Sequence, residues 1–168
     1  MLAFNEGLIA LNLHAPDARM VIDVLARKLH DQGLVVPEYG EQTYKRELEH
    51  PTGLPTKPFC IAFPHADAAG VHSSGLALAT VAEPVGFRNM GDPDEELQVS
   101  LVIMLANRDP EEQIQTLRNL ALLFAQPDKL VALRDQPTAQ AAAACLRNEL
   151  HLDLGVDQRG GIPERRNG

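Results

Sequence analysis

The sequence has no excess of basic charge, and this argues against one class of partner. Asp and Glu number 23 against 15 Lys and Arg, so the formal net charge is -8. Binding to the phosphate backbone of a nucleic acid needs Lys and Arg concentrated on one face of the protein. We therefore expect no nucleic-acid partner.

Cysteines and long apolar runs are also scarce. Cys60 and Cys145 are the only cysteines, and each stands among apolar or small residues, which predicts two reduced, buried thiols instead of a disulfide or a metal pair. No run approaches the roughly 20 apolar residues of a membrane span, and the first residues lack the basic start of a signal peptide. These features predict a soluble protein of the cytoplasm, without direct membrane insertion.

What is present fits one α/β domain, since 168 residues with 45% apolar content suffice for a sizeable core. Short apolar segments predict strands at 7–13, 60–63, 75–81 and 97–106. Helical spacing and cap residues predict helices over 17–32, 41–49, from Asp109 onward and after Pro137, with a short helical turn at 129–133. We expect helical crossovers between the strands, which then form a largely covered sheet.

The helix that begins at Asp109 has a clear start signal, because Pro110 occupies its first position and Glu residues follow. Its apolar residues recur at helical spacing, and we expect them to form its core-facing side: Ile114, Leu117, Ala121 and Phe124. The tail at 155–168 has two adjacent glycines and no apolar periodicity, which predicts disorder.

The candidates for chemistry are histidines, because the sequence contains neither a G-x-x-x-x-G-K-[ST] phosphate loop nor a G-x-S-x-G elbow. His65 directly follows the predicted strand 60–63, is preceded by Pro64, and is followed by small residues that leave room for another macromolecule. A neutral imidazole is a good nucleophile near pH 7 and can carry a phosphoryl group. Arg46 is the nearest candidate for a cation that binds phosphoryl oxygens.

The histidines have two other interpretations. His65 and Asp67 stand two residues apart, with His72 nearby, so a metal site is an alternative. No second cluster of ligands supports it. The remaining histidines fit solvent-facing positions, at element ends or on a polar helix side: His14, His30, His50 and His151.

The segment RELEHPTGLPTKPFCIAFPHAD at 46–67 resembles the phosphorylation-site region of fructose/mannitol-type enzyme IIA domains of the bacterial phosphoenolpyruvate-dependent phosphotransferase system. Three features of that family occur here in order: Arg46-Glu47, Thr52-Gly53 and the strand that ends in Ile61-Ala62-Phe63-Pro64-His65. The resemblance extends over about residues 5–150 and is greatest to the galactitol-type branch. It implies a single-domain fold with a mixed β-sheet covered by α-helices.

The resemblance also implies a phosphoryl relay without a cofactor or metal. HPr would donate the phosphoryl group to His65, on Nε2, and a cysteine of enzyme IIB would accept it to serve a membrane permease, IIC. Arg46 would hold phosphoryl oxygens, with Thr52 and Gln113 as weaker hydrogen-bond donors; Gln113 stands where related domains often carry a second histidine. Partners would use an apolar surface around His65, formed by Ile61, Phe63 and Ala66.

Two alternatives share this fold. The domain resembles regulatory IIA proteins too, whose phosphorylation state controls a binding partner. It could also be a module of a larger transcription regulator, although the sequence contains no helix-turn-helix segment. The transported sugar is not encoded in a IIA domain, because selectivity lies in the permease; a polyol or related sugar is expected.

Overall fold

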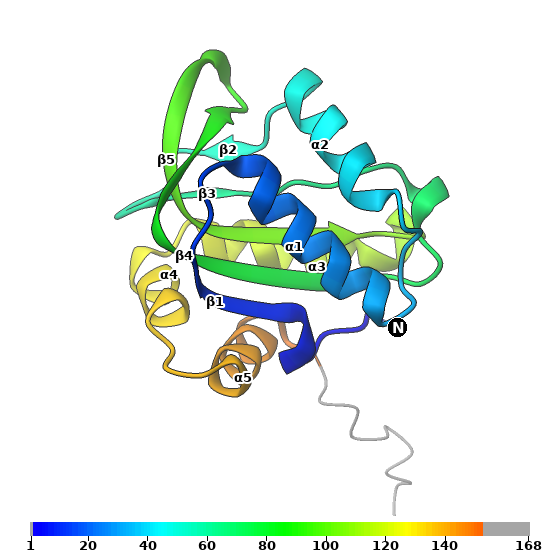
Figure 1. The fold of residues 1–168 in the computed structure, drawn as a ribbon. Helices are drawn as coiled ribbons and strands as arrows, with labels where there is room; N and C mark the ends of the chain where they lie inside the picture. Colours follow the sequence, from blue (N-terminus) through cyan, green and yellow to red (C-terminus); the bar gives the residue numbers. More distant parts are fainter. Residues whose placement is uncertain (1, 153–168) are drawn as a thin grey trace, which may run out of the picture.

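Two long strands, β4 (Gly75–Asn89) and β5 (Asp92–Ala106), form the centre of the fold in the computed structural model, which describes residues 2–152 (Figure 1). They pair antiparallel from Gly75 opposite Ala106 to Asn89 opposite Asp92, and a tight turn joins them. The predicted helical crossover between them is therefore wrong. The outer halves of both strands bury only alternate residues, such as Phe87 and Leu97, so they lack the apolar run by which a covered strand is recognised.

Three shorter strands complete a mixed sheet. β1 (Ile9–Leu13) runs parallel to β4, and β3 (Cys60–Ala62) runs parallel to β5. β2 (Gly53–Leu54) pairs antiparallel with β3 and also reaches β4. The expected single-domain α/β fold with a mixed sheet is confirmed, and the carboxyl ends of β3 and β5 share one sheet edge.

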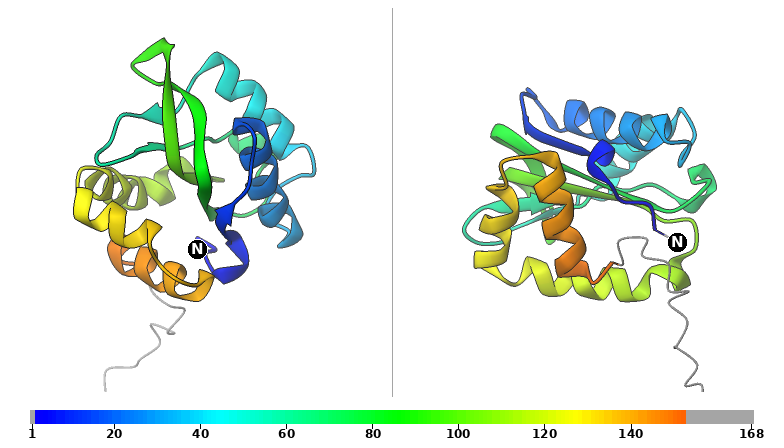
Figure 2. Two further views of the ribbon diagram at one scale, coloured as in Figure 1. Left: turned by 60° about the vertical axis from the view of Figure 1, so that its left-hand side comes forward. Right: turned by 90° about the horizontal axis from the view of Figure 1, so that it is seen from below.

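Helices cover both faces of this sheet (Figure 2). α1 (Ala18–Asp31) and α2 (Tyr39–Glu49) lie on one face, while α3 (Ile114–Phe124), α4 (Pro127–Arg134) and α5 (Ala139–Leu150) lie on the other. Side chains of β5 alternate between the two cores, with Val102 and Met104 in one and Leu101 and Ile103 in the other. Burial on both faces explains the continuous apolar run of this strand. Three short 3-10 helices occur in the connections: η1 (Glu6–Leu8), η2 (Ala68–Gly70) and η3 (Pro110–Gln113).

Local signals fix the helix ends as the sequence predicts. The Asp17 side chain accepts a hydrogen bond from the Met20 amide at 3.0 Å, and Thr138 caps α5 in the same way. Gly33 ends α1 with a φ of 72°, a conformation that favours glycine. Two predictions were too short: α2 begins at Tyr39, and the turn expected at 129–133 is the eight-residue helix α4.

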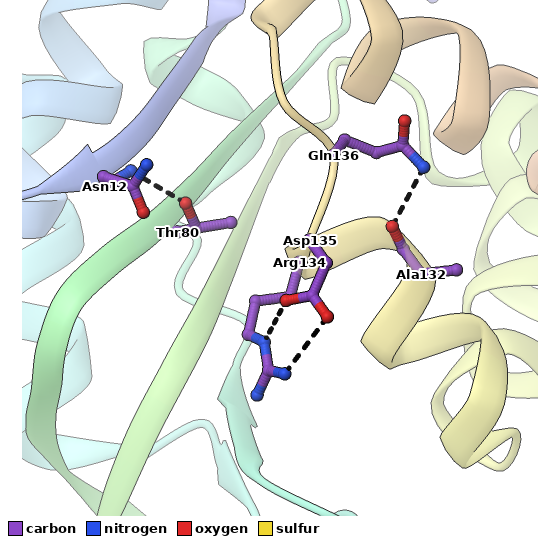
Figure 3. A network of polar contacts seen from close by, with 6 residues as sticks. All are labelled: Asn12, Thr80, Ala132, Arg134, Asp135 and Gln136. Carbon is purple, nitrogen blue, oxygen red and sulfur yellow. Dashed lines mark hydrogen bonds and ion pairs between the residues drawn. The ribbon is translucent and has the colours of Figure 1, made fainter.

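Two local features shape the side of the sheet near α4 (Figure 3). Asn12 has a φ of 52° within a register shift of β1, and its amide donates to the Thr80 hydroxyl at 2.9 Å. At the end of α4, the Gln136 side-chain amide donates to the Ala132 carbonyl at 3.0 Å. Both contacts satisfy backbone groups where regular pairing stops.

The core-facing side of α3 differs from the prediction. Ile114 and Leu117 are 47% and 37% exposed, whereas the buried residues are Thr116, Asn119, Leu120 and Leu123. Burial of Asn119 is offset by hydrogen bonds, since its side chain donates to the Leu150 carbonyl at 3.0 Å and accepts from Gln115. The apolar pattern was therefore misassigned, because polar residues occupy part of the buried face.

Three further predictions concern the rest of the chain. Cys60 and Cys145 are free thiols, as expected, but they are half-buried and not buried. Among residues 2–152, no helix has the length and apolar character needed to cross a membrane. The tail at 155–168 lies outside the described residues.

Candidate functional site

His65 lies just beyond the carboxyl end of β3, where Pro64 prevents further strand pairing. Its Nδ1 is 3.0 Å from the carbonyl oxygen of Phe63. A carbonyl oxygen only accepts, so this contact assigns the proton to Nδ1 and leaves a lone pair on Nε2. The half-buried imidazole therefore has the nitrogen with the free lone pair turned away from the backbone contact.

Helix α2 faces this segment with one side. Tyr39, Thr43, Arg46 and Glu47 stand at positions i, i+4, i+7 and i+8, which lie on the same side of a helix. Three of the four are buried, although all are polar; only Arg46 is partly exposed. The polar helix expected from the sequence thus directs polar side chains into the protein at the site.

Glu47 binds the residue that precedes β2. Its carboxylate accepts from the Thr52 amide at 2.9 Å and from the Thr52 hydroxyl at 2.8 Å. The same hydroxyl oxygen accepts from the Phe63 amide at 3.2 Å. Burial raises the pKa of Glu47, and the hydrogen bonds from Thr52 lower it to a smaller extent. The Thr52 hydroxyl therefore donates its hydrogen to Glu47, and Thr52 connects α2 to the strand before His65.

Tyr39 binds the other side of His65. Its hydroxyl oxygen accepts from the amide of Ala66 at 3.2 Å, while the ring is fully buried. Burial raises the pKa of Tyr39, so the hydroxyl is neutral at physiological pH. The residues immediately before and after Pro64-His65 are therefore both tied to α2.

Arg46 supplies the positive charge of the site. Its Nη1 lies 3.4 Å from Oδ1 of Asp67, whose side chain is 87% exposed. An ion pair this open to solvent is weak. The Arg46 Nε is buried and has no hydrogen-bond partner among residues 2–152. The partly exposed end of the guanidinium retains donors for a further anion, because its one ion pair is weak, and Arg46 lines an open pocket of about 380 Å³.

Gln113 comes from the connection that follows β5. It is buried at the end of η3, and its amide oxygen accepts from the Thr116 hydroxyl at 3.1 Å. The amino group is the end of this side chain that can donate to a ligand. Because β3 and β5 run parallel, the segments bearing His65 and Gln113 leave the sheet at the same edge.

An apolar surface adjoins His65, but its composition differs from the prediction. Ile61 is fully buried in the core and cannot contribute to it. The Phe63 ring lies 5.7 Å from the His65 ring and 6.1 Å from the Phe124 ring, measured between centroids. Phe124 shares one flank of α3 with three exposed residues at helical spacing: Ile114, Leu117 and Ala121. We call these three residues and Phe124 the α3 stripe.

The metal alternative gains no support from this geometry. Within the described residues 2–152, no three His, Cys, Asp or Glu side chains gather closely enough to hold a metal ion. Asp67 instead faces Arg46. The site offers a free imidazole nitrogen, a guanidinium with unused donors and an adjacent apolar surface.

Comparison with known proteins identifies the family. The model of the phosphoenolpyruvate-dependent sugar phosphotransferase system, EIIA 2, matches residues 2–149. The chain belongs to this family. The galactitol-specific EIIA component of Escherichia coli (strain K12) is 32% identical over 124 residues, which cover 74% of this chain and 82% of the relative. The resemblance seen in the sequence is thus confirmed.

Solved EIIA structures share the fold. The PTS IIA protein PtxA from Streptococcus mutans superposes with a TM-score of 0.71 at 23% identity, covering 88% of this chain and 92% of that chain. The complex of enzyme IIA Mtl with phosphorylated enzyme IIB Mtl from Escherichia coli gives a TM-score of 0.69 at 23% identity, covering 90% and 99%. In that complex an EIIA domain is bound to its IIB partner.

Sequence reasoning did not find the contacts of Tyr39 and Asp67 at this site, and it gave Glu47 no role beyond its place in a motif. A signal was present, because Tyr39, Thr43 and Glu47 recur at a spacing of four and mark one side of α2. That spacing is usually sought in apolar residues. Here it is carried by polar residues that the fold buries.

Proposed function

We propose that the chain carries phosphoryl groups on His65, taking them from HPr and passing them to a cysteine of an enzyme IIB. The observation that carries this proposal is the contact between His65 Nδ1 and the Phe63 carbonyl, 3.0 Å long. With the proton held on Nδ1, the lone pair of Nε2 is available as the nucleophile at neutral pH.

Both phosphoryl transfers run directly between protein side chains and need no cofactor or metal. Nε2 of His65 attacks the phosphorus atom carried by HPr; an N–P bond forms on His65 and the bond to the HPr carrier atom breaks. In the second step a IIB thiolate attacks the same phosphorus, an S–P bond forms, and the lone pair returns to Nε2. Because Nδ1 keeps its proton and its contact with Phe63 throughout, the ring need not reorient between the steps.

Three residues support this chemistry. Arg46 holds phosphoryl oxygens and stabilises the charge that shifts during transfer, in keeping with its partly exposed guanidinium and its single weak ion pair. Gln113 offers its amino group as a neutral donor in place of a second imidazole. Thr52 acts mainly through position, because its hydroxyl is already bonded to Glu47 and to the Phe63 amide.

The partners would dock on the α3 stripe together with Phe63 and Ala66. This apolar surface reaches the His65 ring through Phe63 and Phe124, and HPr and IIB would use it in turn. Exposed apolar residues next to a reactive group are typical of surfaces that bind other proteins. The net charge of -8 would steer a basic donor toward the domain.

The galactitol-specific relative favours a role in the uptake of a polyol or related sugar, with HPr, IIB and the domain meeting in the cytoplasm and IIC in the membrane. The alternative is a regulatory role, in which the phosphorylation state controls another partner. Genes for a IIB and a IIC beside this gene would support transport, and an isolated gene would support regulation.

Intact-mass analysis tests the proposal directly. Wild type, His65→Ala and the control His72→Ala, which alters an exposed histidine of the same connection, are incubated with enzyme I, HPr and phosphoenolpyruvate. We expect one acid-labile phosphoryl group on wild type and on His72→Ala, and none on His65→Ala. Labelling of His65→Ala at the wild-type level, or no labelling of wild type by a donor system active on another IIA, would contradict it.

A further inference from the structure

We infer that Tyr39 is a positioning residue for the phosphoryl-acceptor histidine, acting through its hydrogen bond to the Ala66 amide. This inference rests on the proposed function. The Tyr39 hydroxyl oxygen lies 3.2 Å from the Ala66 nitrogen, and Ala66 directly follows His65 in the chain. Tyr39 itself does not act on the phosphoryl group in this scheme.

The hydroxyl is held in place by rigid surroundings. The Tyr39 side chain is packed inside the protein, since its exposed fraction is 0% and it is among the largest fully buried side chains. Its amide donates to the Val36 carbonyl at 3.1 Å, and its carbonyl accepts from the Thr43 hydroxyl at 2.7 Å. A hydroxyl buried at this depth is costly unless it is hydrogen-bonded, so its contact with Ala66 is not incidental.

This contact is one of two tethers that flank His65. On the other side, the Phe63 amide donates to the Thr52 hydroxyl, which is bound to Glu47. Tyr39 and Glu47 both belong to α2, and so does Arg46. One helix therefore fixes both ends of the Phe63–Ala66 segment and also carries the cation of the site.

The Tyr39 hydroxyl lies within the field of the charged pair. After burial, which raises the pKa of Tyr39 most, Asp67 raises it further and Arg46 lowers it. The hydroxyl contacts the backbone at Ala66, between His65 and Asp67. Phosphoryl transfer depends on the alignment of Nε2 with the incoming phosphorus, and small displacements of a reacting atom are expensive. Loss of the tether would slow transfer while the core stays filled.

The test compares Tyr39→Phe with Tyr44→Phe. Both remove one hydroxyl from α2, but Tyr44 is only half-buried, and its ring lies under the Arg19 guanidinium and not at His65. Two kinds of measurement are made. NMR of the unphosphorylated protein gives the chemical shift and the hydrogen-exchange rate of the Ala66 amide, and also the chemical shifts of the His65 ring nitrogens. A kinetic assay gives the rate of phosphoryl uptake from HPr.

For Tyr39→Phe we expect faster exchange of the Ala66 amide, shifted His65 ring nitrogens, and uptake slowed by about five- to tenfold, as one neutral hydrogen bond implies. Tyr44→Phe should match wild type in all of these. Wild-type rates and spectra for Tyr39→Phe would overturn the inference while leaving His65 as the acceptor. If wild type takes up no phosphate, the proposed function fails. The chemical shifts of the Ala66 amide and the His65 ring nitrogens still test whether the Tyr39 hydroxyl positions His65. An unprotected Ala66 amide in wild type would overturn the inference even if Tyr39→Phe did not fold.

Discussion

Glu47 accepts two hydrogen bonds from Thr52, one from its amide at 2.9 Å and one from its hydroxyl at 2.8 Å, inside the protein. These two hydrogen bonds do not fully replace the water that a carboxylate loses on burial. The pKa of Glu47 is therefore raised above its ordinary value of 4.5. The link between α2 and the strand before His65 is therefore also a titratable link.

We predict that Glu47 makes the stability of the domain depend on pH in a defined direction. A carboxyl group with a raised pKa keeps its proton in the folded state at pH values where the unfolded chain has lost it. Its favourable contribution is complete below 4.5 and is lost as pH rises through the folded-state pKa. The Glu47→Gln variant lacks this titration, so its stability should decline less between pH 4.5 and neutrality than that of wild type.

Urea unfolding at several pH values measures this, with Glu49→Gln as the control, since Glu49 is an exposed acid at the end of the same helix. Glu49→Gln should follow the wild-type pH profile. Glu47→Ala should lose about 1–3 kcal/mol of unfolding free energy, because the buried Thr52 amide loses its partner. Parallel pH profiles for wild type and Glu47→Gln would refute the prediction.

The helix ends and the buried strand at the centre of the sheet could be predicted from the sequence, because local signals mark them. Asp17, Gly33 and Thr138 mark helix ends by local chemistry that needs no tertiary context. The buried strand of β5 was visible as an apolar run because both of its faces are covered. His65 and Arg46 could be proposed as site residues because their motif is contiguous and resembles that of a known family.

What could not be predicted depends on burial that the local sequence does not reveal. The outer halves of β4 and β5 bury only alternate residues, such as Phe87 and Leu97, and are otherwise mainly polar and exposed, so they suggested a connection. On α3, buried Thr116 and Asn119 reversed the assignment of inside and outside. On α2, the polar residues that surround the site are buried because each has a partner in another segment, and such partners are known only once the chain is folded.

Arg46 leads to the second prediction. Its side chain is partly exposed and makes one weak ion pair, so Arg46→Ala should change the unfolding free energy by less than about 1 kcal/mol. Phosphoryl uptake should slow by about 100-fold, because a donor that stabilises the transition state is lost. Arg46→Lys keeps the charge without the planar fork and should be intermediate. Quench-flow measurements with phospho-HPr give these rates; an unchanged rate for Arg46→Ala would remove it from the mechanism.

Asp67 provides the third prediction, in which a substitution makes phosphoryl uptake faster instead of slower. Its carboxylate lies 3.4 Å from Arg46 Nη1, so it would compete with a phosphoryl group for the guanidinium. Asp67→Asn removes a negative charge at nearly constant size, so uptake should quicken by up to about fivefold, which corresponds to about 1 kcal/mol for an exposed pair. The gain should shrink in high salt, which screens the charge. Slower uptake by Asp67→Asn would mean that Asp67 helps to orient Arg46 instead.

The α3 stripe gives the fourth prediction, and α3 itself offers the control. Leu117 and Leu122 are both exposed leucines of this helix, but only Leu117 shares the flank of Phe124, which contacts Phe63 next to His65. Leu117→Ser should raise the KM for phospho-HPr by about tenfold with little change in kcat, since burial of a leucine at an interface contributes on the order of 1–2 kcal/mol. Leu122→Ser should leave both constants unchanged.

The two variants also separate docking from folding. Each replaces an exposed leucine on the same helix, so their unfolding midpoints should both stay close to that of wild type. Titration with a 15N-labelled domain should show HPr perturbing the amides of the α3 stripe and not those around Leu122. Equal KM values for the two variants would contradict docking of the partner on the α3 stripe.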